Sequence, residues 1–260
     1  MSKKYIFFDI DGTLTNSNPG GIILPSTMNT LKKLEENGHF ISIATGRNYT
    51  MAKETLEETG IKNAVCCGGN ALVIDNKLQY VKPLDREKVD ELIEECILKD
   101  IPFCIMKDDS DNMYTHSEEL INGNCAMKMI GNIQYVNKEE YKKFEEIHKV
   151  FILIPRFQEN TIKSFKQLDI HYARYHDDHL VVEPDDKYQG IIDMIHTIGG
   201  NLDDVVVFGD GHNDLSMMKQ AAISIAMGNA IDELKEIADF ITKDCKSDGI
   251  EYACQCYGWI

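Results

Sequence analysis

Two aspartates stand two residues apart directly after an apolar run near the start of the chain. Residues 5–8 are Tyr-Ile-Phe-Phe, and Asp9, Ile10, Asp11 and Gly12 follow. A short apolar run that ends at a turn glycine predicts a buried strand. Side chains two apart on a strand point the same way, so both carboxylates should emerge at its carboxyl end, where open α/β sheets bind ligands. They could act as nucleophile and proton donor or hold a metal, whereas the alternative is a solvated Asp-Gly turn.

Polar residues also follow two later apolar runs. Thr45 comes after the run 39–44, and Asp210 and Asp214 come after the strongly apolar run 204–208. Parallel strands of one sheet share their carboxyl edge, so these groups can converge with the first pair of aspartates. Each of them alone could belong to an ordinary turn or cap a helix. Their joint occurrence, each directly after a strand pattern, predicts a single site.

The residue types at these strand ends suit phosphoryl transfer. Asp9 would attack phosphorus to form an aspartyl-phosphate, and Asp11 would protonate the leaving oxygen and later activate water. Asp9, Asp210 and Asp214 offer hard oxygen ligands that suit Mg²⁺. A cation there would also offset the repulsion between the acidic edge and an anionic substrate.

The phosphoryl group also needs hydrogen-bond donors. The hydroxyl of Thr45 and the backbone N–H groups beside it, including that of Gly46, could supply them at the start of a helix. Lys187 begins the predicted helix 187–198 and would be the second cation of the site. A lone lysine at a helix start is more often solvated, so this assignment depends on the other motifs.

Alternating strand and helix patterns must position these groups. They predict an α/β core with a parallel sheet and right-handed crossovers, formed by residues 1–82 and 184–260. Between them, residues 83–183 mix helix and strand patterns without a catalytic strand end, which predicts an inserted α+β domain. The predicted elements are helices 26–37, 49–59, 85–98, 138–149, 159–167, 187–198 and 231–238, short helices from Leu215 and after Ser247, a hairpin at 71–81, and strands 103–106, 150–154, 180–183, 204–208 and 222–226.

The composition excludes several kinds of partner. The net charge of −16 argues against binding to nucleic acid or to an anionic membrane. No apolar run approaches the ~20 residues needed to cross a bilayer, and the run at 5–8 is too short for a signal peptide. Eight scattered cysteines without an export signal favour reduced thiols. We therefore expect a cytoplasmic protein.

Four segments together resemble the four motifs of the haloacid-dehalogenase (HAD) superfamily. Two further segments, at 227–230 and 248–250, are similar to the tail of its Cof-type phosphatases. The chain departs from the usual pattern at Gly68-Gly69-Asn70-Ala71, where many relatives have Asn-Gly-Ala, and at Gly190, because the lysine motif often reads Lys-Gly whereas here the glycine comes three residues after the lysine. The four motifs are Asp9-Ile-Asp11-Gly12-Thr13-Leu14-Thr15, Ala44-Thr45-Gly46-Arg47, Lys187-x-x-Gly190 and Gly209-Asp210-Gly211-His212-Asn213-Asp214.

The resemblance implies a Rossmann-like core with a type IIB cap inserted between the second and third motifs. It also implies a role for each matched residue: Asp9 is the nucleophile, Asp11 the acid/base, and Thr45 and Lys187 hold the phosphoryl group. Asp210 would bind Mg²⁺ with Asp9 and the backbone carbonyl of Asp11, and Asn213 and Asp214 would complete the metal and phosphate shell.

The function that this resemblance favours is Mg²⁺-dependent hydrolysis of small phosphate monoesters, such as a sugar phosphate or a similar metabolite. A phosphomannomutase-like phosphomutase has the same type of cap and stays open as an alternative. A non-catalytic binder of phosphorylated ligands is a further alternative, although it would have no need for Asp11. Substrate contacts should come from the cap, where the candidates, each more often a plain surface residue, are His116, Lys128, Arg156, Arg174 and His176. The natural substrate and the oligomeric state do not follow from the sequence.

Overall fold

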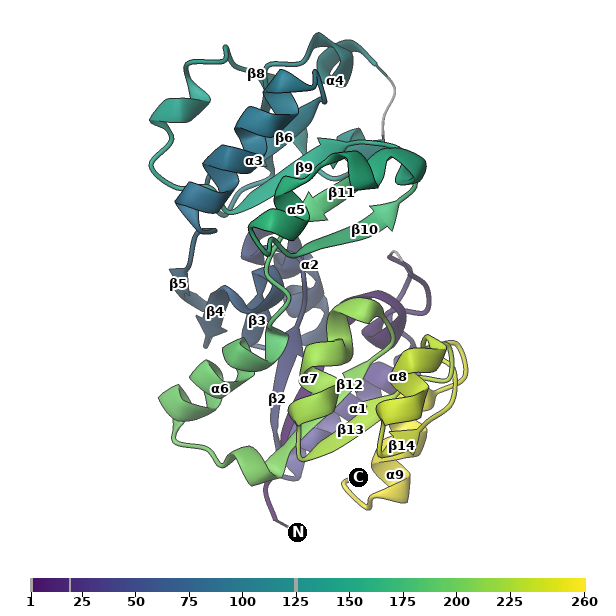
Figure 1. The fold of residues 1–260 in the computed structure, drawn as a ribbon. Helices are drawn as coiled ribbons and strands as arrows, with labels where there is room; N and C mark the ends of the chain where they lie inside the picture. Colours follow the sequence, from purple (N-terminus) through teal and green to yellow (C-terminus); the bar gives the residue numbers. More distant parts are fainter. Residues whose placement is uncertain (1, 19, 124–125) are drawn as a thin grey trace. The chain divides into compact units, whose positions relative to one another are not determined.

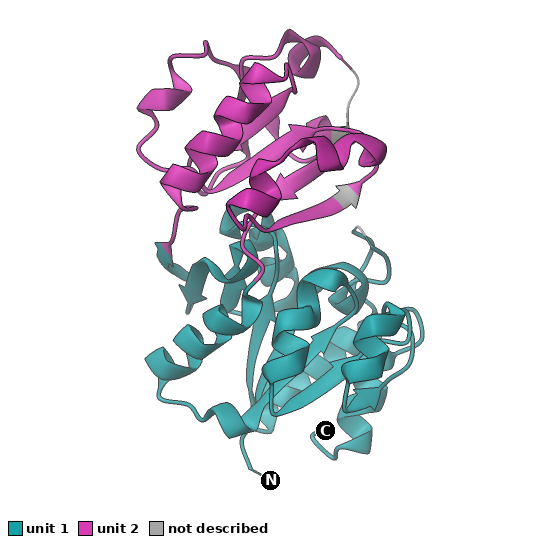
Figure 2. Ribbon diagram, in the orientation of Figure 1, with its two compact units in different colours: residues 1–80, 186–260 teal, residues 81–185 magenta. Residues whose placement is uncertain are grey.

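The computed structural model describes residues 2–18, 20–123 and 126–260, and the chain divides into two compact units (Figure 2). Unit 1 comprises Met1–Tyr80 and Asp186–Ile260, and unit 2 comprises Val81–Asp185. Each unit has its own hydrophobic core. The predicted fold class, a parallel-sheet α/β core interrupted by an α+β domain, is confirmed.

Unit 1 is built on one sheet of eight strands. Neighbouring strands run parallel from β14 to β3, and β4 pairs antiparallel with β3. The parallel arrangement aligns the carboxyl ends of the central strands at one edge. In sheet order the strands are β14 (Phe240–Ile241), β13 (Ile223–Ala226), β12 (Val205–Gly209), β1 (Tyr5–Phe8), β2 (Phe40–Ala44), β3 (Ala64–Cys66), β4 (Ala71–Ile74) and β5 (Lys77–Val81).

Helices cover both faces of this sheet (Figure 1). Because both faces are covered, strand β12 is apolar along its whole length, and Val206 and Val207 are fully buried although they point to opposite faces. Helices α6 and α7 pack together on one face, and α1 packs with α9 on the other. The helices of unit 1 are α1 (Pro25–Glu36), α2 (Tyr49–Thr59), α6 (Lys187–Ile198), α7 (Leu215–Gln220), α8 (Asp232–Ile237) and α9 (Gly249–Cys256).

Unit 2 is an α+β unit with a sheet of six strands. The strand pairs are antiparallel except for β7 and β8, which run parallel. Its core lies between the sheet and α3, where Leu92, Ile93 and Ile152 are buried together. In sheet order the strands are β10 (Tyr172–His176), β11 (His179–Val182), β9 (Lys149–Leu153), β6 (Phe103–Met106), β7 (Asn112–Thr115) and β8 (Asn132–Tyr135), and the helices are α3 (Arg86–Leu98), α4 (Glu118–Asn122) and α5 (Ser164–Gln167).

The helix predicted at 138–149 is wrong. This segment has only a short 3-10 turn, Tyr141–Lys143, and its last residue begins β9. The backbone N–H of Leu84 donates to the carbonyl of Ile147 (2.7 Å), and that of His148 donates to Met106 (2.8 Å). Hydrogen bonds to distant segments thus hold an extended chain, which overrides a helical spacing of apolar residues in a segment too short to be stable alone.

The single helix predicted at 159–167 is also wrong, because it is interrupted. A 3-10 helix, Arg156–Thr161, is followed by the extended Ile162 (φ −83°, ψ 106°) and then by α5. The carboxylate of Glu95 accepts hydrogen bonds from the backbone N–H groups of Lys163 (2.9 Å) and Ser164 (2.8 Å). A carboxylate from another helix therefore starts α5 here, which a local pattern does not reveal.

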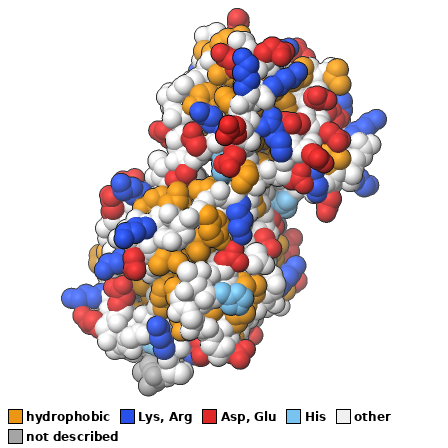
Figure 3. All heavy atoms as spheres, turned by 90° about the vertical axis from the view of Figure 1, so that its left-hand side faces the viewer, with side chains coloured by type: hydrophobic (Ala, Val, Ile, Leu, Met, Phe, Trp, Pro, Cys, Tyr) orange, Lys and Arg blue, Asp and Glu red, His pale blue; other side chains and the backbone are white. Residues whose placement is uncertain are grey.

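Charged side chains of both signs are interspersed over the face drawn in Figure 3, on both units. On this face, therefore, neither sign of charge is gathered into a patch of its own. No helix in the described part of the chain has the length and hydrophobicity that crossing a lipid bilayer requires.

Candidate active site

The register of the three central strands brings the predicted site residues to one edge. Phe8 of β1 pairs with Phe208 of β12 and with Ile43 of β2. The next residues along each strand lead directly to Asp9, Asp210 and Thr45. The backbone N–H of Asp9 continues the ladder by donating to Phe208 (3.1 Å). Residues about 200 positions apart in sequence thus meet because parallel pairing aligns their strand ends.

The chain turns sharply after Asp9, which separates the two aspartates of the first motif. A short helical turn, Ile10–Leu14, contains Gly12 at φ +78°. A Cβ at Gly12 would lie 2.2 Å from Oδ2 of Asp210, so this position requires glycine both for its backbone conformation and for the close approach of Asp210. Thr15 closes the turn, because its hydroxyl donates to the carbonyl of Ile10 (3.0 Å).

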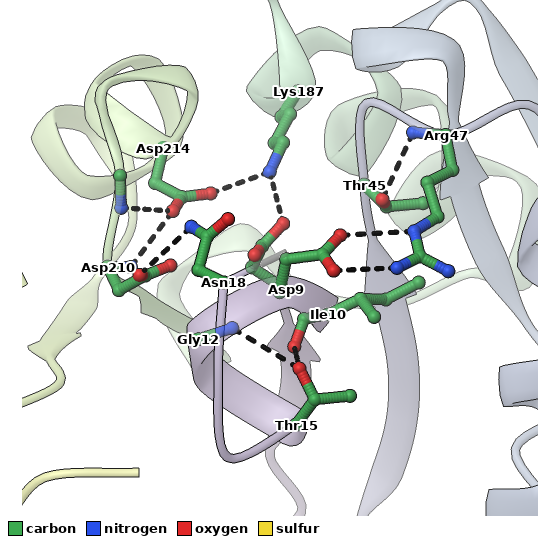
Figure 4. A network of polar contacts seen from close by, with 12 residues as sticks. Asp9, Ile10, Gly12, Thr15, Asn18, Thr45, Arg47, Lys187, Asp210 and Asp214 are labelled. Atoms are coloured by element: carbon green, nitrogen blue, oxygen red, sulfur yellow. Dashed lines mark hydrogen bonds and ion pairs between the residues drawn. The ribbon is translucent and has the colours of Figure 1, made fainter. Parts of the chain in front are cut away.

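Lys187 joins two of the acidic groups. It is fully buried at the first residue of α6. Its Nζ donates to Oδ1 of Asp9 and to Oδ1 of Asp214, both at 2.6 Å, and lies between them in Figure 4. Charge-assisted bonds of this length are the strong ones. The structure therefore brings together three predicted site residues that belong to separate sequence motifs.

Gly190 explains how α6 comes close enough for Lys187 to reach the strand ends. A Cβ at Gly190 would lie 2.3 Å from Cγ1 of Val65 and 3.0 Å from Cα of Gly69. Likewise, a Cβ at Gly69 would lie 2.1 Å from the carbonyl oxygen of Asp186. The two departures from the usual family pattern, the glycine pair at 68–69 and the late motif glycine, therefore lie in contact. They allow the first turn of α6 to pack against the end of β3.

Asp214 organises the loop that carries Asp210. Its Oδ2 accepts hydrogen bonds from the backbone N–H groups of Asp210 (2.9 Å) and Gly211 (3.0 Å), and its residue is fully buried. One oxygen of Asp214 therefore caps the loop while the other binds Lys187. Asn213 lies on the same 3-10 turn, His212–Asp214, and is half-buried.

Two asparagines near Asp210 were not among the predicted site residues. Nδ2 of Asn18 and Nδ2 of Asn229 each lie 3.4 Å from Oδ2 of Asp210, and Asn229 also donates to the carbonyl of Gly12 (2.8 Å). Asn229 belongs to the segment 227–230 that resembles the tail of Cof-type phosphatases, and this is the signal in the sequence that could identify it. Asn18 stands in a loop with no strand pattern before it.

The electrostatics of this cluster favour a bound cation. One ligand atom each of Asp9, Asp210 and Asp214 lie within 4.8 Å of one another. Burial raises the pKa of Asp9 well above its usual value, against the opposing charge of Lys187. Burial, and then the charge of Asp214, raises the pKa of Asp210 to about 7. Both shifts mean that an ionised carboxylate is unfavourable in this buried position, first because of burial and then because of the neighbouring carboxylates.

Lys187 alone does not balance the three carboxylates. Burial by itself would lower its pKa, but the charges of Asp214 and Asp9 outweigh that effect and raise it. With every group ionised, three carboxylates and one ammonium leave a net charge of −2. A divalent cation with oxygen ligands would bring this sum to zero, so the residues present fit such an ion.

Thr45 and Arg47 form the other side of the site. The hydroxyl oxygen of Thr45 is buried and accepts a hydrogen bond from the backbone N–H of Arg47 (3.1 Å), and Gly46 lies between them at the end of β2. Arg47 forms an ion pair with Asp11, with Nη2 to Oδ1 at 2.6 Å (Figure 4 labels Arg47). Arg47 stands in the second motif, but the sequence alone predicts no role for it.

The four predicted substrate contacts of unit 2 do not all come together. Arg156, Arg174 and His176 line one pocket of about 220 Å³ with Asp177, whereas Lys128 donates from a separate 3-10 helix to the carbonyl of Ile121 (2.7 Å). Nε of Arg174 also forms an ion pair with Oε2 of Glu159 (2.8 Å), and its Nη1 donates to the carbonyl of Ile154 (3.0 Å). These contacts stabilise the β10–β11 hairpin. The ring of His116, a further candidate for substrate contact, packs edge-on against Phe103.

Comparison with known proteins gives the class of enzyme. A family model described as haloacid dehalogenase-like hydrolase matches residues 6–253. A Bacillus subtilis (strain 168) protein named "Putative phosphatase YkrA" is 33% identical over 258 residues, which cover 97% of each chain. The chain is thus a phosphatase by its similarity to these proteins. The chain belongs to the haloacid dehalogenase-like hydrolase family.

Two further relatives have more specific names. The 5-amino-6-(5-phospho-D-ribitylamino)uracil phosphatase YitU of Bacillus subtilis (strain 168) is 25% identical over 268 residues, 96% of each chain. The solved structure of the HAD subclass IIB sugar phosphatase BT4131 has a TM-score of 0.81 and 27% identity, and it covers 99% of this chain and 100% of that one. These matches confirm the predicted family, the type IIB architecture and the enzyme class.

Proposed function

We propose that the protein is a Mg²⁺-dependent phosphatase that hydrolyses small phosphate monoesters through an aspartyl-phosphate at Asp9. The observation that carries this proposal is the position of Asp9. It lies buried at the end of β1, with Lys187 2.6 Å from one carboxylate oxygen and the acidic groups of Asp210 and Asp214 beside it. A carboxylate so placed can serve as nucleophile at the edge where the substrate would bind.

Each neighbouring side chain has a proposed task. The ammonium of Lys187 would bind the phosphoryl oxygens while it holds Asp9 in place, and the hydroxyl of Thr45 and the N–H of Gly46 would donate to the same group. Asp11 would give a proton to the leaving oxygen and then take one from the attacking water. Asn213 would complete the phosphate shell.

Asp9, Asp210 and Asp214 would hold the metal ion, with the backbone carbonyl of Asp11 as a further ligand. When bound, Mg²⁺ would supply positive charge that, together with Lys187, balances the three carboxylates and so removes their repulsion of the incoming phosphate. Its preference for oxygen ligands matches this donor set. Asn18 and Asn229 would keep the Asp210 side chain in place.

The substrate class rests on the relatives. One is named as a sugar phosphatase and another as a phosphatase of a phosphorylated ribityl compound, both small phosphorylated metabolites. In this proposal unit 2 is the cap, and its pocket of Arg156, Arg174 and His176 contributes substrate contacts. Lys128 remains a further candidate from the same unit.

The test is phosphate release from a panel of sugar phosphates and from p-nitrophenyl phosphate, with Mg²⁺ or with EDTA. We expect release that requires the metal and that disappears in Asp9→Asn. Activity that survives Asp9→Asn, or the absence of activity on every ester, would overturn the proposal. Conversion of a sugar phosphate into its isomer, stimulated by a sugar bisphosphate, would instead establish a phosphomutase.

A further inference from the structure

Arg47 holds the carboxylate of Asp11 with a two-pronged contact. Its Nε donates to Oδ2 (3.0 Å) and its Nη2 donates to Oδ1 (2.6 Å). The backbone N–H of Gly20 adds a third bond to Oδ1 (2.7 Å). A guanidinium bound to both oxygens fixes the plane of the carboxylate as well as its place, which a lysine cannot do.

The backbone of Arg47 is itself fixed at two points. Its N–H donates to the hydroxyl oxygen of Thr45 (3.1 Å), and its carbonyl accepts from the N–H of Cys67 (2.8 Å). Arg47 is thereby anchored to the ends of β2 and β3. The sheet therefore fixes the backbone position from which the Arg47 side chain extends to Asp11.

The direction of the Asp11 carboxylate depends on its side-chain contacts, because the residue lies on a turn and not within a strand. It lies on the turn after β1, next to Gly12, and its side chain is 22% exposed. An acid or base must sit within hydrogen-bond reach of the atom that gains or loses the proton, and small misplacements cost large factors in rate.

We propose that Arg47 is the residue that positions the acid/base Asp11, and that it acts through Asp11 rather than by binding the transferred phosphoryl group. This inference rests on the proposed function, because it takes Asp11 as the acid/base. The two cations of the site contact different carboxylates: Lys187 binds Asp9 and Asp214, whereas Arg47 binds Asp11.

The test compares two esters that differ in their need for an acid. The p-nitrophenolate group leaves without a proton, whereas the alkoxide of a sugar phosphate must be protonated as it leaves. We expect Arg47→Met to lower kcat/KM for the sugar phosphate by at least ~30-fold and for p-nitrophenyl phosphate by less than ~3-fold. Arg47→Lys should recover only part of the loss because it lacks the fork.

A double-mutant cycle isolates the contact between the two side chains. In an Asp11→Asn background, Arg47→Met should cost less than ~2-fold in kcat/KM, because the group that it positions is already gone. Equal losses for both esters, or a full additional loss in the Asp11→Asn background, would show that Arg47 binds the phosphoryl group and would overturn the inference. An unchanged kcat/KM for the sugar phosphate in Arg47→Met would overturn it as well.

Lys4→Met is the matched control. Lys4 forms a comparably exposed ion pair with Asp204 (2.5 Å), which lies just before β12 at the opposite edge of the same sheet. It should leave the ratio of the two kcat/KM values unchanged. Failure of the proposed function is recognised separately, because wild-type activity would then be absent or insensitive to Asp9→Asn whatever Arg47 does.

Discussion

Lys187 remains charged although it is fully buried, because two carboxylates lie 2.6 Å from its ammonium group. Removing the ammonium group of Lys187 while keeping both carboxylates should therefore destabilise the folded protein. Without it, Asp9 and Asp214 would be buried carboxylates with no cation to bind, and breaking a buried pair in this way is strongly destabilising. The contacts that we propose to prepare Asp9 for phosphate therefore also affect the stability of unit 1.

We predict that Lys187→Met destabilises the metal-free protein by about 3 kcal/mol and abolishes phosphatase activity. Denaturant unfolding in EDTA measures the first effect. Lys53→Met is the control, because Lys53 forms an exposed pair with Glu57 at 3.8 Å and should change the stability by less than about 0.5 kcal/mol. Equal stability of the two variants would contradict a structural role for Lys187.

Asp210 should make the metal-free protein less stable as the pH rises. Its pKa is about 7 in the folded chain, above the ordinary value of 3.8. The folded state therefore holds this proton more tightly than the unfolded state, and the resulting stabilisation, full below pH 4, is lost as the pH rises to 7.

Replacing Asp210 by asparagine removes the charge that causes this loss. We predict that Asp210→Asn is more stable than the wild type by on the order of 2 kcal/mol at pH 8 and about equally stable at pH 4, in EDTA. Thermal melting at both pH values measures the difference. A gap that is larger at pH 4 than at pH 8 would contradict the assigned direction.

At the scale of the elements, the sequence predicted unit 1 much better than unit 2. Apolar strands that end in Asp9, Thr45 and Asp210 carry their own signal, since burial on both faces makes them apolar throughout. In unit 2 the segments 138–149 and 159–167 depend on hydrogen bonds to distant residues, such as those accepted by Glu95. The ion pair of Arg47 with Asp11 could not be predicted for the same reason, because only the fold brings the two side chains together.

The close packing of α6 on β3 gives a prediction about Gly190. We expect Gly190→Ala to push the first turn of α6 away from Val65, to cost about 1–3 kcal/mol, and to lower the activity by moving Lys187. A second change, Val65→Ala, removes the atom that a Cβ would meet at 2.3 Å and should restore part of the activity.

Gly199→Ala is the control at the other end of the same helix. Gly199 has φ +68° and open space around it, so alanine there should cost about 1 kcal/mol through its backbone conformation alone. Assays at a temperature where both variants are folded should show a loss of activity in Gly190→Ala only. A comparable loss in Gly199→Ala would mean that general destabilisation, and not the position of Lys187, is responsible.

At the scale of the whole molecule, the charge of the chain and the charge of the site have the same sign. The net charge of −16 opposes an anionic substrate, and the buried cluster adds an unbalanced charge of its own. A divalent cation should therefore bind the folded protein tightly, and it should do so without any substrate. Because such an ion binds the folded state only, it should raise the stability of the protein.

We predict that Mg²⁺ raises the melting temperature of the wild type in a saturable way, with about 2.7 kcal/mol of stabilisation at a hundred times the dissociation constant. Asp210→Asn should lose this response. NaCl at matched ionic strength screens surface repulsion and should shift both proteins alike. A Mg²⁺ response that is equal in the two proteins would place the ion somewhere other than the acidic cluster.

The central claim is that Asp9 carries the phosphoryl group during turnover. Acid quenching of the enzyme during hydrolysis, followed by mass spectrometry of its peptides, tests this most directly. We expect one additional phosphoryl group on the peptide that contains Asp9, more of it in Asp11→Asn because hydrolysis of the intermediate is slowed, and none in Asp9→Asn. A phosphoryl group on another residue would contradict the account, as would rapid turnover by Asp9→Asn.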